Sequence, residues 1–212
     1  QAKSSTYNPI DEVIMKQLPE GIYVAIVTPM YADETINHDE LANQVERHIG
    51  AGMHAIFCLG TNGEFYALSY DEKMSVIRTV LKVADGRRPV FAGAGCITTA
   101  ETIKVAEEAE KLGVSGISVI SPFFVALTQE QLYDHFKAVA ESVALPVILY
   151  NIPSRTGNDI EADTVARLTG IPNIAGIKDS SGKLSKVESF IDIGASDFSV
   201  FAGTDSLVLP GL

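Results

Sequence analysis

The chain has few of the features that mark secreted, membrane-spanning or disulfide-stabilised proteins. Its 212 residues include only two cysteines, Cys58 and Cys96, and both lie in apolar stretches. This predicts reduced, packing cysteines rather than a disulfide scaffold. No uninterrupted apolar run approaches the roughly 20 residues that a membrane helix needs, and the first residues lack the apolar centre of a secretion signal. We therefore expect a cytoplasmic protein.

Basic residues are also scarce. The sequence has 16 lysines and arginines against 27 aspartates and glutamates, which gives a net charge of -11. Such a surface repels nucleic acid and anionic membranes, so we expect neither as a partner. A small anionic substrate stays possible, because a pocket can be locally basic inside an acidic protein. With 46% hydrophobic residues, the chain has enough apolar material for a sizeable globular core.

The four histidines show no metal-ligand spacing, and three lie in or beside helical patterns. They are His38, His48, His54 and His135. We therefore assign no metal site.

Short apolar runs alternate regularly with longer amphipathic ones. Seven runs are rich in Val, Ile and Phe and are apolar on both alternating faces, which predicts parallel strands covered on both sides. These runs are residues 21–29, 55–60, 89–95, 116–122, 146–151, 174–180 and 198–204. Helical patterns lie between them, such as residues 39–52, 71–86, 99–113 and 128–142. Thr128 before Gln131 predicts a capping box, and Gly113 predicts a helix end.

Seven strand–helix repeats indicate an α/β protein, either a doubly wound sheet or a (β/α)8 TIM barrel. Polar side chains follow nearly every strand, as a barrel mouth requires, whereas an open sheet concentrates its site at one switch point. These side chains are Thr28, Thr61, Asn62, Glu64, Ser121, Tyr150, Asn151, Lys178, Asp179, Thr204 and Asp205. The barrel is therefore favoured. Gly93 and Gly95 follow a strand, but no third glycine completes a dinucleotide-binding motif.

The predicted boundaries are a polar N-terminal extension over residues 1–20 and a barrel over residues 21–212. The sequence stops just after the seventh predicted strand. A seven-stranded parallel barrel would expose two strand edges. We therefore expect a barrel that is incomplete at its C-terminal end, truncated after the seventh strand and without its eighth βα unit.

Lys178 stands at the end of a predicted buried strand and is the first candidate for chemistry. Burial disfavours a charged amine, and a neutral amine is a nucleophile that can attack a ketone to form an imine. The alternative interpretation is a structural ion pair with Asp179 or another carboxylate. Spacing by itself leaves both interpretations open.

Three further groups are candidates. Tyr150 ends the preceding strand, where a phenol can move protons, although a tyrosine at a strand end often only packs its ring. Residues 60–64, GTNGE, form a tight turn whose N–H groups and side chains can meet a carboxylate, or a turn selected for geometry alone. Arg155 offers a planar fork for a second carboxylate, or it is simply solvated.

Together these motifs resemble the dihydrodipicolinate synthase / N-acetylneuraminate lyase family of class I aldolases. The resemblance begins near Gly21 and runs to the end of the sequence. It is carried by AIVTPM (25–30), GTNGE (60–64), YNIPSRTG (150–157) and GIKDSSG (176–182), in this order and at these strand ends.

The resemblance implies a role for each matching position. Lys178 would be the Schiff-base lysine that captures pyruvate or another 2-oxo acid, and Tyr150 would be the general acid/base. Thr61 and Asn62 would hold the carboxylate and relay protons, and Gly60 would permit close approach. It also implies a (β/α)8 barrel with a C-terminal helical region absent here, no metal or organic cofactor, and a homo-oligomer, a dimer or tetramer.

Two departures bear on the substrates. Synthases of the lysine pathway usually have a second threonine where this chain has Asn62, and a tyrosine donated across the dimer where it has Phe123 and Phe124. Arg155, in contrast, matches an arginine that binds the carboxylate of the aldehyde partner in the synthases. We expect both Arg155 and Phe124 to be substrate-binding residues. NGEF (62–65) looks closer to members that resemble 4-hydroxy-2-oxoglutarate aldolase.

We therefore expect a lyase that acts on pyruvate and an aldehyde by imine formation. The reaction we expect first is cleavage of a hydroxylated 2-oxo acid to pyruvate. The alternative is dihydrodipicolinate synthase, which condenses pyruvate with aspartate semialdehyde. A catalytically silent barrel with a binding or regulatory role stays open, while a metal-dependent barrel aldolase is disfavoured by the histidine pattern.

Overall fold

The computed structural model describes residues 18–195 and 197–210. The predicted N-terminal extension, residues 1–20, therefore lies almost entirely outside the described residues. Within them, seven parallel strands form one sheet in the consecutive order β1-β2-β3-β4-β5-β6-β7. The strands are β1 (Tyr23–Ala25), β2 (Ala55–Cys58), β3 (Val90–Gly93), β4 (Gly116–Ile120), β5 (Val147–Asn151), β6 (Ile174–Asp179) and β7 (Ser199–Ala202).

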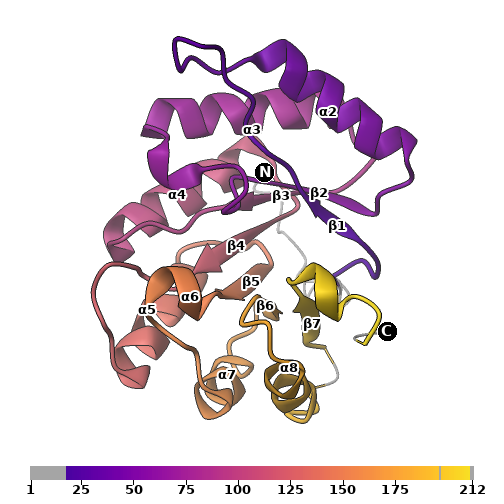
Figure 1. The fold of residues 1–212 in the computed structure, drawn as a ribbon. Coiled ribbons are helices and arrows are strands. Elements are labelled where there is room, and N and C mark those ends of the chain that lie inside the picture. The colour runs from indigo at the N-terminus through magenta and orange to yellow at the C-terminus, as the bar shows by residue number, and fades with distance from the viewer. Residues whose placement is uncertain (1–17, 196, 211–212) are drawn as a thin grey trace, which may run out of the picture.

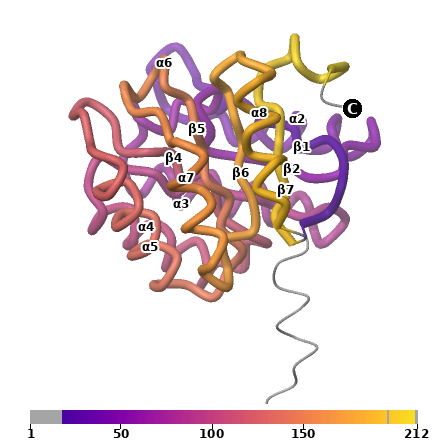
Figure 2. Tube along the Cα trace, turned by 90° about the horizontal axis from the view of Figure 1, so that it is seen from below, coloured from indigo at the N-terminus to yellow at the C-terminus, as the bar shows by residue number. Residues whose placement is uncertain are grey.

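The sheet curls, and the long helices lie on its outer side (Figures 1 and 2). The α-helices are α2 (His38–Gly50), α3 (Tyr70–Ala84), α4 (Thr99–Leu112), α5 (Gln129–Glu141), α6 (Pro153–Thr156), α7 (Ala162–Leu168) and α8 (Leu184–Ile191). Two 3-10 helices are η1 (Phe65–Ala67) and η2 (Asp205–Leu207). A doubly wound sheet would reverse its strand order at a switch point, and this sheet does not. The prediction of a TIM-type α/β barrel is confirmed, and the doubly wound alternative is wrong.

All seven predicted apolar runs contain a strand, and the four predicted helical patterns coincide with α2, α3, α4 and α5. The capping box is present at Thr128, whose hydroxyl accepts from the Gln131 N–H while the Gln131 side chain accepts from the Thr128 N–H. Gly113 ends α4 with a φ of 89°, a left-handed conformation that favours glycine. The sequence patterns did not locate α6, α7 and α8, which are shorter.

The strands bury side chains on two faces. The outer face packs against the helices in a large apolar core, which includes Ile56, Val119 and Phe136. The inner face forms a smaller cluster of Leu18, Ala55, Phe57, Phe91, Ile148 and Ala175, against which Tyr23 and Phe201 pack. The rings of Tyr23 on β1 and Phe201 on β7 have centroids 4.8 Å apart. The first and last strands of the sheet therefore meet through side chains across the interior.

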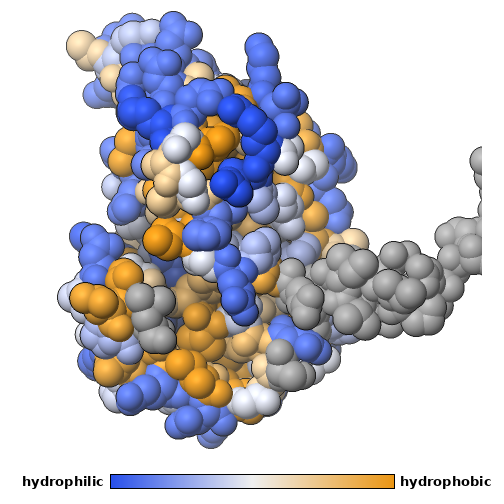
Figure 3. Space-filling view, turned by 90° about the vertical axis from the view of Figure 1, so that its right-hand side faces the viewer, coloured by the Kyte–Doolittle hydropathy of each residue, from blue (hydrophilic) through white to orange (hydrophobic). Residues whose placement is uncertain are grey.

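One side of the molecule combines apolar side chains with unpaired strand edges. Figure 3 shows apolar side chains gathered on the side where β1 and β7 lie. Among the described residues, β1 pairs only with β2 and β7 only with β6, so each leaves one strand edge unpaired on this side.

Candidate functional site

The predicted catalytic side chains come from three strands at one end of the barrel. Tyr150 is near the end of β5, Lys178 is near the end of β6, and Thr61 follows β2. In a parallel barrel the carboxyl ends of all strands open at the same mouth, which is where TIM-barrel active sites lie. The positions predicted from separate parts of the sequence are therefore brought to one end of the fold.

A β-bulge turns Lys178 toward the interior. Val147 pairs with Ile174, but Ile148 pairs with Gly176, so Ala175 has no partner on β5. The extra residue shifts the register by one, and a one-residue shift moves following side chains to the opposite face. As a result Lys178 lies opposite Tyr150.

The amine of Lys178 contacts aromatic rings instead of a carboxylate. Its Nζ lies 3.9 Å from the centroid of the Tyr150 ring and 5.6 Å from that of Phe57. Within the part of the chain that the structure describes, no ion pair involves Lys178. The carboxyl group of Asp179 instead accepts from Asn151 and Ser181. Among the described residues, the structure therefore shows no ion pair of Lys178 with Asp179 or another carboxylate.

Tyr150 and Thr61 form the second part of the site. The Tyr150 hydroxyl and Thr61 Oγ1 are 3.2 Å apart, within hydrogen-bonding distance. Tyr150 is 4% exposed, so its ring is held by the barrel wall while its hydroxyl meets Thr61. One phenol therefore contacts both the lysine amine, through its ring, and the threonine hydroxyl, through its oxygen.

The GTNGE segment is a tight turn. The Gly63 N–H donates to the Gly60 carbonyl at 3.0 Å, and the Glu64 N–H donates to the Thr61 carbonyl at 3.1 Å. The buried Thr28 hydroxyl supports the turn by donating to the Gly63 carbonyl at 2.7 Å. Within residues 18–195 and 197–210, the N–H groups of Thr61 and Asn62 make no hydrogen bond. The turn thus presents two free donors, which is what a carboxylate requires.

Three predicted residues stand apart from this cluster. Asn62 and Arg155 are exposed, the first in the turn and the second on α6. Phe124 is 91% exposed and has a φ of 79°, whereas its neighbour Phe123 packs edge-on against Phe65 with ring centroids 5.9 Å apart. None of the three contacts the Lys178 amine, so their substrate-binding roles stay predictions.

Two residues that the sequence did not single out border the site. Phe57 projects inward from β2 beneath the lysine amine. Gly203 follows β7, and a Cβ at this position would lie 2.9 Å from Lys178 Cε and in contact with Ser180 Oγ. Inward alternation along β2 would have found Phe57. Nothing in the local sequence marks Gly203, because its neighbours come from another strand.

A small cavity lies beside Tyr150. Its volume is about 10 Å³, and its lining includes Gly60, Phe65, Ser118 and Tyr150. This is room for about one water molecule.

Neither a metal cluster nor a membrane helix is found within residues 18–195 and 197–210. No three His, Cys, Asp or Glu side chains gather there in a way that would hold a metal ion. No helix in this part combines the length and apolarity that crossing a bilayer requires.

The arrangement of amine, phenol and hydroxyl is suited to imine chemistry. A lysine amine that no acid neutralises can attack a carbonyl carbon once it has lost its proton. A phenol in contact with both the amine and a second hydroxyl can deliver and remove the protons that imine formation moves.

The chain is similar to known proteins of one family. The model of the dihydrodipicolinate synthetase family matches residues 18–212. The chain is 41% identical over 189 residues to the 4-hydroxy-tetrahydrodipicolinate synthase 1 of Halalkalibacterium halodurans, covering 89% of this chain and 64% of that protein.

Solved structures give the same picture. The 4-hydroxy-tetrahydrodipicolinate synthase of Methylacidiphilum fumariolicum SolV superposes with a TM-score of 0.88 at 39% identity, covering 91% of this chain and 64% of that one. The chloride-inhibited dihydrodipicolinate synthase of Acinetobacter baumannii, complexed with pyruvate, superposes with a TM-score of 0.88 at 42% identity, covering 90% and 65%. The chain thus spans slightly less than two thirds of the length of these relatives. The match of the family model and the shared fold together show that the chain belongs to the dihydrodipicolinate synthetase family.

Proposed function

We propose that the protein is a class I lyase that captures pyruvate as an imine on Lys178. The observation that carries this proposal is the position of the Lys178 amine, 3.9 Å from the Tyr150 ring centroid, while the Tyr150 hydroxyl lies 3.2 Å from Thr61 Oγ1. The pyruvate bound in the A. baumannii relative supports the choice of 2-oxo acid.

In the proposed reaction the neutral amine adds to the C2 carbonyl carbon of pyruvate. The carbonyl oxygen takes up protons and leaves as water, and a carbon–nitrogen double bond forms. Tyr150 delivers and recovers protons through Thr61, and the free N–H groups of the 60–64 turn bind the pyruvate carboxylate. Loss of a proton from C3 then gives an enamine, the nucleophile for carbon–carbon bond formation.

For the second substrate we propose aspartate semialdehyde, so that the reaction is that of a 4-hydroxy-tetrahydrodipicolinate synthase. The names of the relatives favour this alternative over the cleavage reading that NGEF first suggested. Arg155 adds support, because it is exposed on α6 and, among the described residues, no carboxylate pairs with it. Its guanidinium is free to bind the carboxylate of the aldehyde.

Cleavage of a hydroxylated 2-oxo acid is the second candidate, and Asn62 and Phe124 are the observations that favour it. An amide and a phenyl ring stand where synthases usually have hydroxyl groups, and a phenyl ring relays no proton.

We also propose a homo-oligomer. Phe124 is 91% exposed, so its ring is available to a second copy of the chain.

Borohydride reduction in the presence of pyruvate tests the proposal. The purified protein is mixed with pyruvate and reduced, and peptide mass spectrometry locates the adduct. We expect the mass of the reduced pyruvate adduct on Lys178 and on no other lysine, such as the exposed Lys183. Absence of an adduct in folded protein would support the silent barrel instead.

Steady-state assays then separate the two reactions. We expect turnover when aspartate semialdehyde is supplied with pyruvate, and slow or no release of pyruvate from hydroxylated 2-oxo acids. The reverse pattern would assign the protein to the cleaving enzymes and would leave imine formation at Lys178 intact.

A further inference from the structure

The strand pair that carries Tyr150 and Lys178 has two conceivable registers. In the observed register the bulge at Ala175 places Lys178 opposite Tyr150 and Asp179 opposite Asn151. Without the extra residue, Ile177 would lie opposite Tyr150, and Lys178 would lie opposite Asn151 and face the helices. Because a slip of one residue reverses every following side chain, the site exists in only one of these registers.

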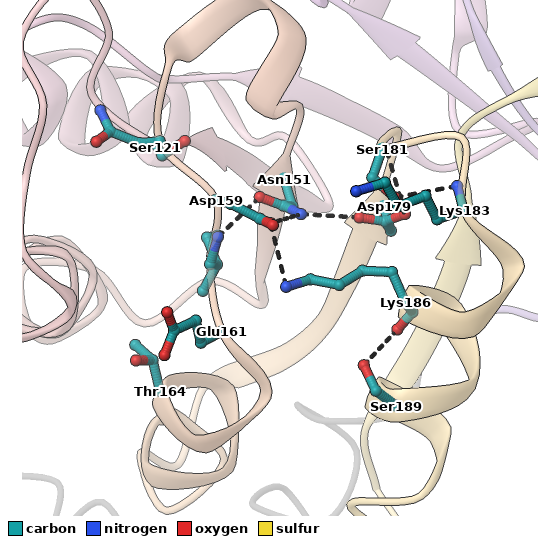
Figure 4. A network of polar contacts seen from close by, with 12 residues as sticks. Ser121, Asn151, Asp159, Glu161, Thr164, Asp179, Ser181, Lys183, Lys186 and Ser189 are labelled. Atoms are coloured by element: carbon teal, nitrogen blue, oxygen red, sulfur yellow. Dashed lines mark hydrogen bonds and ion pairs between the residues drawn. The ribbon is translucent and has the colours of Figure 1, made fainter.

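Asn151 and Asp179 join the two strands on the face opposite the site. Both side chains are fully buried, and Asn151 Nδ2 donates to Asp179 Oδ1 at 2.8 Å. The other Asp179 oxygen accepts from the Ser181 hydroxyl at 2.6 Å and from the Ser181 N–H at 3.2 Å. Figure 4 shows this contact at the ends of the strands. Asn151 directly follows Tyr150 in the chain, and Asp179 directly follows Lys178.

The contact is tied into its surroundings. Asn151 Oδ1 accepts from the Ile160 N–H at 3.0 Å, and Asn151 Nδ2 also donates to Asp159 Oδ1 at 2.8 Å. The same Asp159 oxygen lies 3.2 Å from Lys186 Nζ on α8 (Figure 4). The Asn151–Asp179 contact is therefore anchored to the loop after α6 and to the helix that follows β6.

We propose that the Asn151–Asp179 pair is a register lock that positions Lys178 beside Tyr150. In the slipped register, Asp179 would no longer lie opposite Asn151, and the hydrogen bond between the two side chains would be lost. Buried polar groups without partners are strongly disfavoured, whereas apolar side chains at these positions would tolerate both registers. A single buried polar contact is known to select one register in other folds. The catalytic consequence rests on the proposed function; the register itself does not.

The test replaces the pair by two apolar residues. The double variant Asn151→Leu/Asp179→Leu keeps apolar side chains on the outer face and removes the polar contact, at the cost of the acceptors for the Ile160 N–H and for Ser181. We expect the rate of adduct formation at Lys178 with pyruvate and borohydride to fall by about tenfold or more, because small misplacements of reacting groups are costly. Hydrogen exchange of the 174–180 backbone amides should also accelerate by about tenfold. Should this variant fail to fold, Asp179→Ala serves in its place.

A conservative variant and a control separate positioning from general stability. Asp179→Asn keeps an oxygen to accept from Asn151, so the rate should stay within about threefold of the parent. Asn173, which directly precedes β6, has a buried amide that donates to the carbonyls of Ala140 on α5 and of Val143 and Leu145 before β5, and Asn173→Ala removes it. This control should lower the stability and leave the adduct rate nearly unchanged.

The outcomes distinguish the lock from the proposed function. Normal adduct formation and normal exchange in the folded double variant would overturn the lock. An equal loss of rate in Asn173→Ala, matched in stability, would also overturn it. If the parent itself forms no adduct, the proposed function fails, and the exchange measurement still decides the lock because it needs no substrate.

Discussion

The two faces of the β5–β6 strand pair behave in opposite ways. On the inner face, Tyr150 and Lys178 make few polar contacts: the amine meets aromatic rings, and the phenol meets one hydroxyl. On the outer face, one residue further along each strand, Asn151 and Asp179 are fully buried and bound on both of their polar atoms. Neighbouring residues in the sequence thus have opposite roles.

This difference follows from the way side chains alternate along the strands of a parallel barrel. Alternation along a strand sends one residue to the mouth and the next into the shell between sheet and helices. The shell can then satisfy its polar groups completely and become rigid, while the mouth keeps groups with spare bonding capacity. The candidate site residues thus make few polar contacts of their own, while the residues that follow them in the chain are bound on both polar atoms.

The largest effect is expected from a substitution of Lys178 on the inner face. Lys178→Met keeps a side chain of similar length against Phe57 and Tyr150 but removes the nucleophile. We expect turnover to fall by about 10³-fold or more and the pyruvate adduct to disappear, with the melting temperature nearly unchanged. Steady-state kinetics and peptide mass spectrometry measure the two effects. Substantial residual turnover with an adduct on another lysine would contradict the assignment.

Removing the phenol hydroxyl should have the next largest effect. Tyr150→Phe keeps the ring beneath the amine and deletes the 3.2 Å contact with Thr61. We expect the catalytic rate constant to fall by about 10²- to 10⁴-fold, the usual range for a lost acid/base group. The rate should drop more than pyruvate affinity does. A variant with an unchanged rate would show that the proton transfers use another group.

A methyl group at Gly203, which follows β7, tests how closely the position of the Lys178 side chain on the inner face is fixed. In Gly203→Ala the new Cβ would lie 2.9 Å from Lys178 Cε and would contact Ser180 Oγ. The lysine must shift, so we expect adduct formation to slow by about 10- to 100-fold. Gly50→Ala is the matched control, because nothing lies within 4 Å of a Cβ there. Equal rates in the two variants would show that Lys178 tolerates displacement.

The smallest effect on the site is expected from a buried group of the helical shell that lies outside it and acts on stability. His135 is 4% exposed, its Nδ1 lies 2.9 Å from Thr99 Oγ1, and its Nε2 has no partner within the described residues. Burial lowers the pKa of His135 to about 4 from its ordinary value of 6.5.

The sign of the effect follows from proton binding. Between pH 6.5 and 4 the unfolded chain binds a proton at His135 that the folded chain does not, so stability is complete above pH 6.5 and falls as the pH drops toward 4. The loss reaches about 3 kcal/mol at most. Urea unfolding at several pH values measures it, and His135→Gln should flatten this part of the profile. An equally steep profile in the variant would assign the loss to other groups.

Much of the fold was readable from the sequence, because strand and helix patterns are local. Runs of Val, Ile and Phe bounded by glycine and proline located all seven strands. The helices of 13 to 15 residues, α2 to α5, were located as well. The shorter helices α6, α7 and α8 escaped, since a segment of four to eight residues carries too few apolar positions to display a period.

The candidate site was readable only in part. Lys178, Tyr150 and Thr61 were identified as residues, and the structure brings them together. The direction of Lys178 was not predictable from strict alternation, because the bulge at Ala175 reverses it. The structure shows the same reversal in the packing: Ile174 and Ile177 both belong to the large outer core, although residues three apart face opposite sides in a regular strand.

The sequence by itself determined which residues are apolar, where strands end and which reactive side chains follow them, since these depend on residue type and spacing. Only the tertiary structure decided that Lys178 faces inward, that Gly203 leaves it room, and that Asn151 and Asp179 pair behind it. These contacts join residues from different strands. Their distances depend on register and curvature, which no local pattern encodes.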